Sequence, residues 1–355
     1  MAADNNKIFD KVLYLGPERK GARGGIAAVL DVYGRNIEHF HYLPTNSPRG
    51  TLAGAAVLLA TLLRMPLERL AGRRIAHIHY ASGKSWTRKK IVLRWARLLG
   101  FRAVMHNHSG GFARQVEADG AEAIARCLGR ADANVCLNRE RLDMFTDRLG
   151  LTNALIVNNP VERPVPPADS MDKFDSPTTI EMVFLGKLCH AKGVYDMLEA
   201  ARRLKAEGLR FHISAGGNGE VEEFKARVDE MDLADCVDYV GWVDAARKDA
   251  LLRRAHVLLL PSYIEGLPIS ILEAMAYSTA VISTPVGGIP SLIESGTNGL
   301  LAPAGDVDAL ADAMQRYITA PSLAREHALQ ARDTVEPYYI DRVTGALADL
   351  YATLL

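Results

Sequence analysis

The sequence predicts an α/β protein built from two Rossmann-like domains, and three observations support this fold class. The chain has 355 residues, which exceeds the roughly 250–300 residues that one hydrophobic core usually organises. Short apolar runs alternate with longer stretches of helical periodicity, as repeated βαβ units require. The alternation stops once, at a proline-rich stretch, and then begins again.

In the first half, five short apolar runs predict the strands of a parallel sheet with helices between them. These runs cover residues 11–16, 74–80, 101–108, 133–138 and 154–159. The apolar run "LAGAAVLLATLL" at 52–63 is shorter than the roughly 20 residues that span a bilayer. It therefore predicts a buried helix of the first domain.

The segment 158–177 contains five prolines and no periodicity, which is typical of a linker. Apolar runs then resume at 179–186, 209–217, 237–242, 256–262 and 280–285. The predicted boundaries are a first domain at 1–160, a linker at 161–177 and a second domain at 178–336.

The composition is that of an ordinary globular protein, with 48% hydrophobic and 24% charged residues. The N-terminal stretch "MAADNNKIFD" has no signal-peptide core, and the four cysteines follow no metal-binding spacing. We therefore expect reduced cysteines and a cytoplasmic location.

The formal net charge is zero, but the charges are unevenly distributed. Residues 1–163 hold 25 Lys and Arg against 14 Asp and Glu, and the rest of the chain holds 17 against 28. The basic half indicates nucleic acid, a phosphorylated acceptor or an anionic membrane as partner, unless its charges are simply solvated. The segment 83–100, with Trp86, Trp95 and a run of basic residues, either lies on such a membrane or forms a helix with a solvated basic face.

Parallel sheets bind ligands outside the carboxyl ends of their strands, and several polar loops of the second half follow predicted strands. Lys187 and Lys192 either neutralise a diphosphate there without a metal or are solvated loop lysines. The stretch "EGLPISILE" at 265–273 leads into a helix predicted to start at Pro268. The free N–H groups of its first turn attract anions, and Gly266 lets a ligand approach the backbone.

The same stretch carries a carboxylate at each end, Glu265 and Glu273. A glutamate is seldom fully buried without a partner. If both side chains face the edge of the sheet, they accept hydrogen bonds from hydroxyls at both ends of a nucleotide-sugar. Otherwise Glu265 is a turn residue and Glu273 lies on an exposed helix face.

In the first half, the glycine-rich loop "KGARGGIAAVL" at 20–30 offers the backbone N–H groups of Gly24 and Gly25 to an anion. It lacks the G-x-G-x-x-G spacing and the acidic residue of a dinucleotide fold, which argues against an oxidoreductase. Another strand ends in "MHNHSGG". Because His106 and His108 alternate there, we expect one to face the ligand and the other the packing, and we favour His108 as the ligand-facing residue.

Together these residues resemble glycosyltransferase family 4, retaining enzymes of the GT-B fold, in which two Rossmann-like domains face each other across a cleft. The resemblance is loose in the first half and strong in the second. It rests there on the element from Gly186 to Gly193, on the spacing of the two glutamates and on the block "LLLPSYIEGLPISILEAMAYSTAVISTPVGGIPSLIESGTNGLL". It also implies that the last segment, about 337–355, returns to the first domain.

The resemblance implies that Lys187 and Lys192 bind the diphosphate of the donor. Five further residues would assist them: Gly266, Leu267 and Ile269 at the helix start, and Gly24 and Gly25 in the first half. The family usually has Arg where this chain has Lys187, which keeps the charge but loses the bidentate fork.

The resemblance also implies that Glu265 contacts the transferred sugar, Glu273 the ribose hydroxyls and His108 the donor sugar. His108, Glu265 and Lys192 are therefore the expected catalytic residues. No carboxylate cluster suited to a metal appears in the sequence, so we expect a metal-independent reaction and no cofactor.

The implied activity is transfer of a sugar, with retention, from a nucleotide diphosphate sugar to a glycan or a lipid-linked acceptor. Such a reaction belongs to cell-surface polysaccharide or glycolipid assembly and needs no nucleic acid. A lipid-linked acceptor would bring the protein to the inner face of the cell membrane, in peripheral contact with anionic lipid. A nucleotide-sugar epimerase of the same fold, or a non-catalytic nucleotide-sugar binding module, would share these sequence features.

Overall fold

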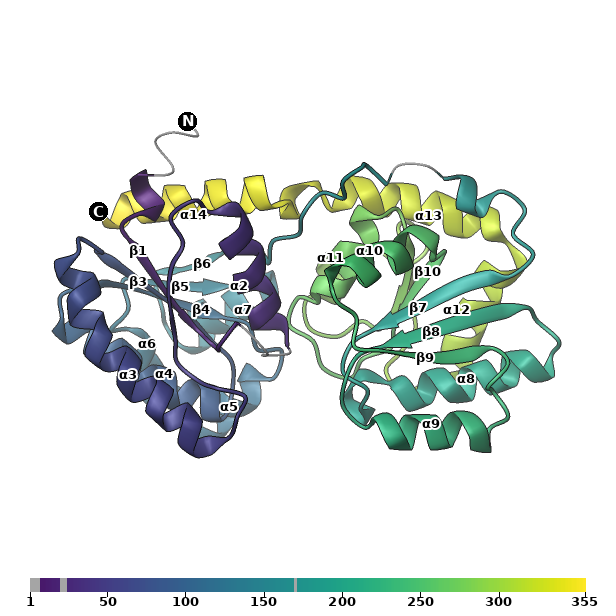
Figure 1. Ribbon diagram of the computed structural model, residues 1–355, viewed down its shortest axis with the longest axis horizontal. Coiled ribbons are helices and arrows are strands. Elements are labelled where there is room, and N and C mark those ends of the chain that lie inside the picture. The colour runs from purple at the N-terminus through teal and green to yellow at the C-terminus, as the bar shows by residue number, and fades with distance from the viewer. Residues whose placement is uncertain (1–6, 20–23, 169–170) are drawn as a thin grey trace. The chain divides into compact units, whose positions relative to one another are not determined.

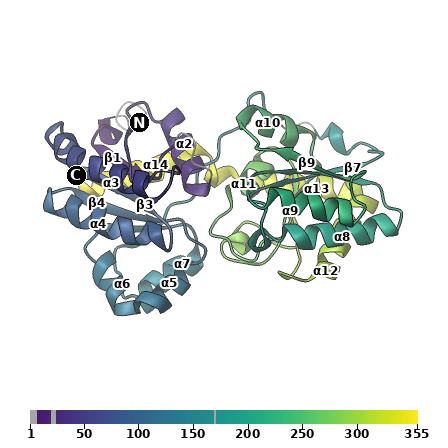
Figure 2. The ribbon, with the colours of Figure 1, turned by 60° about the horizontal axis from the view of Figure 1, so that its bottom comes forward.

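The computed structural model describes residues 7–19, 24–168 and 171–355. The chain forms two compact units. Unit 1 comprises Met1–Pro160 and Tyr338–Leu355, and unit 2 comprises Val161–Pro337. Each unit has one central sheet with helices on both of its faces (Figures 1 and 2).

The sheet of unit 1 has six parallel strands in the order β2-β1-β3-β4-β5-β6. The strands are β1 (Val12–Gly16), β2 (His41–Pro44), β3 (Ile75–Tyr80), β4 (Arg102–Asn107), β5 (Ala133–Cys136) and β6 (Ala154–Ile156). The helices are α2 (Gly25–Asn36), α3 (Thr51–Leu70), α4 (Lys84–Leu98), α5 (Phe112–Asp119), α6 (Ala121–Leu128), α7 (Arg139–Asp143), η1 (Met144–Arg148) and the C-terminal α14 (Ile340–Leu354). Strands β1 and β3 are buried along their whole length, because helices cover both faces of the sheet.

The sheet of unit 2 also has six parallel strands, in the order β12-β11-β10-β7-β8-β9. The strands are β7 (Ile180–Leu185), β8 (Phe211–Gly216), β9 (Val237–Gly241), β10 (Val257–Leu260), β11 (Ala280–Ser283) and β12 (Leu300–Leu301). The helices are η2 (Asp172–Phe174), η3 (His190–Lys192), α8 (Val194–Ala206), α9 (Val221–Glu230), α10 (Ala245–Arg254), α11 (Ile269–Ala276), η4 (Ile289–Ser291), α12 (Val307–Thr319), α13 (Pro321–Thr334) and η5 (Glu336–Tyr338).

The predicted α/β fold with two sheets is confirmed, and each predicted strand is present. The sequence reading missed β2 and β12, which have four and two residues and lie at the edges of their sheets. Runs this short show no alternation by which a strand is recognised.

Part of the segment expected to be a linker is folded onto unit 2. The Lys173 ammonium donates hydrogen bonds to the carbonyl oxygens of Leu252 and Tyr277, at 3.4 and 3.2 Å, and to Thr279 Oγ1 at 3.2 Å. Burial lowers the pKa of Lys173 to about 7. Phe174 beside it is buried, so this part of the segment packs on the unit that follows it.

The prediction that residues 52–63 form a buried helix is wrong. These residues belong to the 20-residue α3, whose Gly54, Thr61 and Met65 are buried while Leu59 and Leu63 are exposed. The run is apolar on both faces of the helix, so its composition cannot show which face the sheet covers.

The segment 83–100 forms α4 (Lys84–Leu98), and two of its residues, Trp86 and Lys89, are inside the protein. Trp86 is buried, and its Nε1 donates a hydrogen bond to Asp119 at 2.9 Å. Lys89 is buried as well and donates hydrogen bonds to the Leu15 carbonyl, at 3.2 Å, and to Thr45. Burial lowers the pKa of Lys89.

Candidate functional site

Four loops at the carboxyl edge of the unit 2 sheet are joined to one another by backbone hydrogen bonds. The loop after β7 meets the loop after β8, where Leu188 N donates to Asn218 O at 2.7 Å. It meets the loop after β10, where Tyr263 N donates to Ala191 O at 3.0 Å. The loop after β11 meets that same loop, where Gly288 N donates to Gly266 O at 2.7 Å. The edge at which parallel sheets bind ligands is therefore one connected backbone surface.

Two glycines allow this close approach of backbones. Gly193 has φ +66°, and a Cβ placed on it would lie 1.9 Å from the Pro261 carbonyl oxygen. Gly287 has φ +56°, and its Cβ would lie 2.0 Å from the Glu265 carbonyl oxygen. Both positions need a residue without a side chain, for the conformation and for the space.

Glu265 is held at this edge by two donors. Its side chain is 7% exposed, and Oε1 accepts a hydrogen bond from Lys192 Nζ at 2.5 Å and another from Ser262 Oγ at 2.7 Å. A buried carboxylate needs such partners. Since the Lys192 side chain is 27% exposed, the pair still reaches solvent and is accessible to a ligand.

Glu273 lies on α11 and is paired with Lys248 from the first half of α10. The Glu273 side chain is 15% exposed and the Lys248 side chain 32%. The sequence reading missed Lys248, and likewise Ser262 beside Glu265, because neither belongs to a motif. Only the fold brings Lys248 to a residue 25 positions later.

Helix α11 begins at Ile269, one residue later than predicted, with Pro268 as its N-cap. Ile271 and Leu272 are buried, as expected, and Ile269 is partly buried. Gly266 and Leu267 precede the helix in the loop that carries Glu265. The first N–H groups of α11 therefore follow Glu265 in the same loop, where an anion would find donors.

Lys187 is exposed in the loop after β7. Among the described residues it forms no ion pair with either glutamate. The structure thus connects Lys192 with Glu265, and Glu273 with Lys248, while Lys187 stands as a cation available to a ligand at the same loop.

In unit 1, His108 belongs to a stack of four histidines from β3 and the end of β4. The rings of His77 and His79 lie 4.4 Å apart between centroids, and those of His106 and His108 lie 4.2 Å apart. The expectation that His106 and His108 face opposite ways is wrong, because residues i and i+2 of a strand lie on one face.

Both ring nitrogens of His108 have partners. Nε2 shares a hydrogen bond with His79 Nδ1 at 2.8 Å, and Nδ1 with Asn159 Oδ1 at 3.1 Å. Burial lowers the pKa of His108 to about 3, so the imidazole is neutral at physiological pH. A neutral His108 carries no charge of its own, and a hydroxyl that binds to its ring nitrogens must replace one of these two partners.

His77, His79 and His106 each have a ligand nitrogen within 4.8 Å of the others. Imidazole lone pairs lie in the plane of the ring, and these rings are stacked with interplanar angles of 8°, 22° and 30°. Stacked rings direct their lone pairs side by side instead of toward one ion, which needs nitrogens about 2.0–2.1 Å away. The trio fits a hydrogen-bonded stack better than a metal centre.

Gly24 is the N-cap of α2, and Gly25 is its first residue. Both are exposed, and a Cβ on either would meet no atom of the described residues within 4 Å. They follow the carboxyl end of β1, where an anion could reach the first turn of α2. Residues 20–23 of the predicted glycine-rich loop lie outside the described part of the chain.

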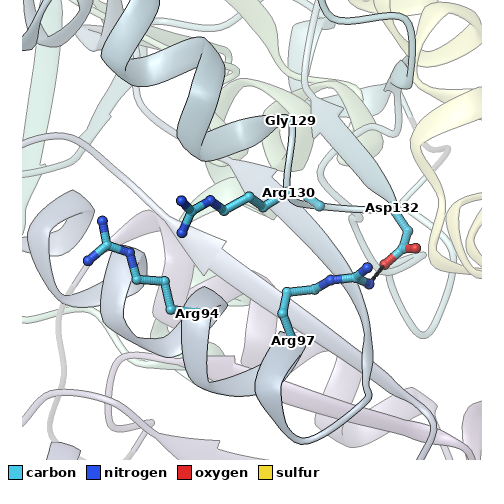
Figure 3. Close-up of a pocket in the computed structure, with 6 residues that line it drawn as sticks. Arg94, Arg97, Gly129, Arg130 and Asp132 are labelled. Atoms are coloured by element: carbon cyan, nitrogen blue, oxygen red, sulfur yellow. Dashed lines mark hydrogen bonds and ion pairs between the residues drawn. The ribbon is translucent and has the colours of Figure 1, made fainter.

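A hollow of about 440 Å³ lies elsewhere in unit 1 (Figure 3). It is lined by Arg94, Arg97, Gly129, Arg130, Ala131 and Asp132. These residues come from the C-terminal half of α4 and from the segment that precedes β5. They lie at the amino edge of the sheet. Arg94 and Arg97 belong to the basic segment 83–100, and none of the lining residues was predicted to be catalytic or to bind the donor.

Residues 179–320 match the family model described as "Glycosyl transferases group 1". The matched region lies within unit 2. It contains every candidate residue of that unit, from Lys187 to Glu273, together with Ser262 and Lys248.

Curated proteins similar to this chain include two that are named for the biosynthesis of colanic acid and of amylovoran. The chain is 34% identical over 145 residues to the putative colanic acid biosynthesis glycosyltransferase WcaL of Salmonella typhimurium, covering 39% of this chain and 36% of that protein. It is 35% identical over 164 residues to the amylovoran biosynthesis glycosyltransferase AmsK of Erwinia amylovora, covering 44% and 40%. The chain thus matches about two fifths of the length of these relatives.

Solved structures match nearly the whole chain. Sucrose-phosphate synthase from Thermosynechococcus elongatus has a TM-score of 0.77 at 20% identity, covering 97% of this chain and 99% of its own. Anabaena HepE in complex with UDP-glucose has a TM-score of 0.77 at 15% identity, covering 96% and 99%. The predicted fold class, α/β with two Rossmann-like domains as in GT-B glycosyltransferases, is confirmed.

Proposed function

We propose that the protein is a retaining glycosyltransferase of family 4 that transfers a sugar from a nucleotide diphosphate sugar to a glycan or lipid-linked acceptor. The observation that carries the proposal is the Lys192–Glu265 pair beside the start of α11, at the carboxyl edge of the sheet in the region that matches the family model. Cell-surface polysaccharide or glycolipid assembly is the process that the names of the WcaL and AmsK relatives support.

In the proposed reaction the bond between the anomeric carbon and the diphosphate breaks. An acceptor hydroxyl loses its proton, and its oxygen forms the new bond on the same face of the sugar. The leaving diphosphate gains negative charge as the bond breaks. Lys192 and Lys187 would stabilise that charge together with the first N–H groups at Gly266, Leu267 and Ile269. Donors that interact more strongly with the leaving group than with the intact substrate lower the barrier.

Glu265 would contact the reacting face of the sugar, and Glu273 would accept hydrogen bonds from the ribose hydroxyls. Lys248 already holds the Glu273 carboxylate, so the hydroxyls would bind a fixed acceptor. Pre-orientation of this kind reduces the ordering cost of binding. The nucleotide would thus be bound at its ribose by Glu273 and at its diphosphate by Lys187 and Lys192.

His108 of unit 1 is proposed to contact the donor sugar as a neutral imidazole, and Gly24 and Gly25 to offer N–H groups to an anion. No cofactor is required, and we propose that the reaction is metal-independent because Lys187, Lys192 and the start of α11 supply the positive charge. We propose that the protein works in the cytoplasm. If its acceptor is lipid-linked, the protein would work at the inner face of the membrane.

The test is a thermal-shift panel of UDP-, GDP-, ADP- and TDP-glucose, followed by incubation of the selected donor with and without an acceptor extract. We expect one nucleotide to raise Tm, and free nucleoside diphosphate to appear in the incubation. An epimerase would convert the donor sugar without releasing nucleoside diphosphate, and a binding module would shift Tm without turnover. Failure of all four nucleotides to shift Tm would contradict the proposal.

A further inference from the structure

Helix α3 carries an exposed face made of leucines. The exposed fractions of Leu52, Leu59, Leu63, Leu67 and Leu70 are 87%, 60%, 68%, 64% and 83%. Ala55, Ala56 and Ala60 are exposed as well, and Arg64 is the charged residue among them. Single exposed leucines are ordinary in soluble proteins, but a contiguous apolar face marks a surface that meets another apolar phase.

The strand connections on either side of α3 limit how this helix could contact a membrane. The helix is long and apolar enough to cross one by length and composition, and 17% of its most apolar 18-residue window is buried. However, α3 joins β2 to β3, and both strands pair with β1 in one sheet. A spanning helix would put these two strands on opposite sides of the bilayer. An α3 that keeps Thr61 and Met65 packed on the sheet must lie along the membrane surface.

The leucine face continues onto α4 and is followed there by cations. The two helices contact each other, and Trp95 Nε1 of α4 donates a hydrogen bond to the Leu62 carbonyl at 2.8 Å. On α4, Ile91 and Leu98 are 46% and 74% exposed. Arg94 lies between them in sequence and is exposed too.

Several arginines on or beside these helices form no ion pair within the described residues, among them Arg64, Arg88, Arg94 and Arg130. The nearby carboxylates are already paired, Asp119 with Lys90 and Asp132 with Arg97 and Arg102. Figure 3 shows Arg94 and Arg130 on opposite walls of the hollow, with Arg97 turned to Asp132. The apolar face is therefore bordered by positive charge that has no counterion among the described residues.

We propose that the leucine face of α3, with the arginines of α4 and Arg130, is the surface by which unit 1 docks on an anionic lipid bilayer. The leucines would enter the boundary between headgroups and acyl chains, and the arginines would bind lipid phosphates. The proposal deepens the proposed function, since a lipid-linked acceptor lies in such a membrane. A second copy of the chain fits this surface less well. A two-fold interface brings the same patch of both copies together, so the arginines of one copy would repel those of the other.

Flotation with phosphatidylcholine vesicles, with and without phosphatidylglycerol, tests the proposal. Wild type should float with the anionic vesicles at low salt, and binding should fall as salt rises because screening shortens the range of the charges. The triple variant Leu59→Gln, Leu63→Gln, Leu67→Gln should bind at least tenfold more weakly. The triple variant Arg88→Gln, Arg94→Gln, Arg130→Gln should lose the preference for anionic lipid.

Two control variants carry changes in unit 2. Val165→Gln replaces a side chain that is 86% exposed, and Arg202→Gln, Lys205→Gln, Lys225→Gln removes the same number of charges. Both should float like wild type. The replaced leucines are exposed, so the triple variant should keep the wild-type Tm, which a thermal melt checks.

Wild type that stays unbound at low salt, or binding that survives the leucine changes, overturns the proposal. So does a dimer in light scattering that the leucine triple variant abolishes while no vesicles are bound, since the face would then be a protein interface. The assay contains no donor and measures no turnover, so these outcomes leave the transferase proposal untouched.

Discussion

The histidine stack of unit 1 should make the protein sensitive to acid. Folding lowers the pKa of His77 from 6.5 to about 3, chiefly by burial, and lowers the pKa values of His79 and His106 as well. Between about pH 6.5 and pH 3 these histidines are therefore protonated in the unfolded chain but remain neutral in the folded chain. Stability is fully present above the unfolded pKa and falls as the pH drops through this window.

The size of the effect follows from the two pKa values of His77. A shift of one pKa unit corresponds to about 1.4 kcal/mol. Because His77 stays neutral in the folded chain, the free energy of unfolding should be about 2 kcal/mol lower at about pH 5 than at pH 7.5. The other three histidines add to this loss, and a few kcal/mol is a large share of the stability of a domain.

Urea unfolding at pH 7.5 and pH 5 measures the loss. Two of the three tryptophans, Trp86 and Trp95, lie in unit 1, so a Trp242→Phe background makes fluorescence report on that unit. Replacing His77 with Gln should reduce the acid-induced loss by about 2 kcal/mol. The exposed His39, changed to Gln, serves as the control and should leave the loss unaltered.

An equal acid-induced loss in the parent and in His77→Gln would refute this reasoning. If His77→Gln does not fold, His108→Gln replaces it, because the pKa of His108 is also lowered to about 3. The same difference of about 2 kcal/mol is then expected.

Three further outcomes are expected in unit 2. Gly287→Ala should lower the free energy of unfolding by about 2 kcal/mol or more, since its Cβ would meet the Glu265 carbonyl oxygen. Gly296→Ala, at φ +87° where a Cβ would meet no atom of the described residues within 4 Å, should lower the free energy of unfolding less in the same denaturation assay. Glu273→Ala should weaken nucleoside diphosphate binding by about 1–3 kcal/mol in calorimetry, and unchanged affinity would remove this residue from the site. EDTA should leave the rate of sugar transfer unaltered, whereas inactivation reversed by Mg²⁺ or Mn²⁺ would assign the diphosphate charge to a metal.

The strands were predictable because buried parallel strands read as short apolar runs, such as "VLYLG" of β1. The buried face of α3 was not predictable, because both faces of the helix are apolar. Only the packing in the fold determines that Met65 is buried while Leu63 is exposed. The error at His106 and His108 was avoidable, because a period of two places both on one face.

The stretch "EGLPISILE" indicated two carboxylates that needed partners, and the structure supplies them. Lys192 was already a candidate, so the Lys192–Glu265 pair joins two residues that the sequence had singled out. Lys248 was not, because it reaches Glu273 only through the packing of α10 near α11. Long-range pairs of this kind are set by the fold and have no local signature.

The most direct test of the central claim is calorimetric titration of the nucleoside diphosphate selected by the thermal-shift panel. Lys192→Met is compared with wild type and with Lys205→Met, a control at the C-terminal end of α8. We predict that Lys192→Met weakens binding at least tenfold, or about 1.4 kcal/mol, while Lys205→Met binds like wild type. Equal affinity of Lys192→Met and wild type, with both proteins folded, would contradict a diphosphate site at the Lys192–Glu265 pair.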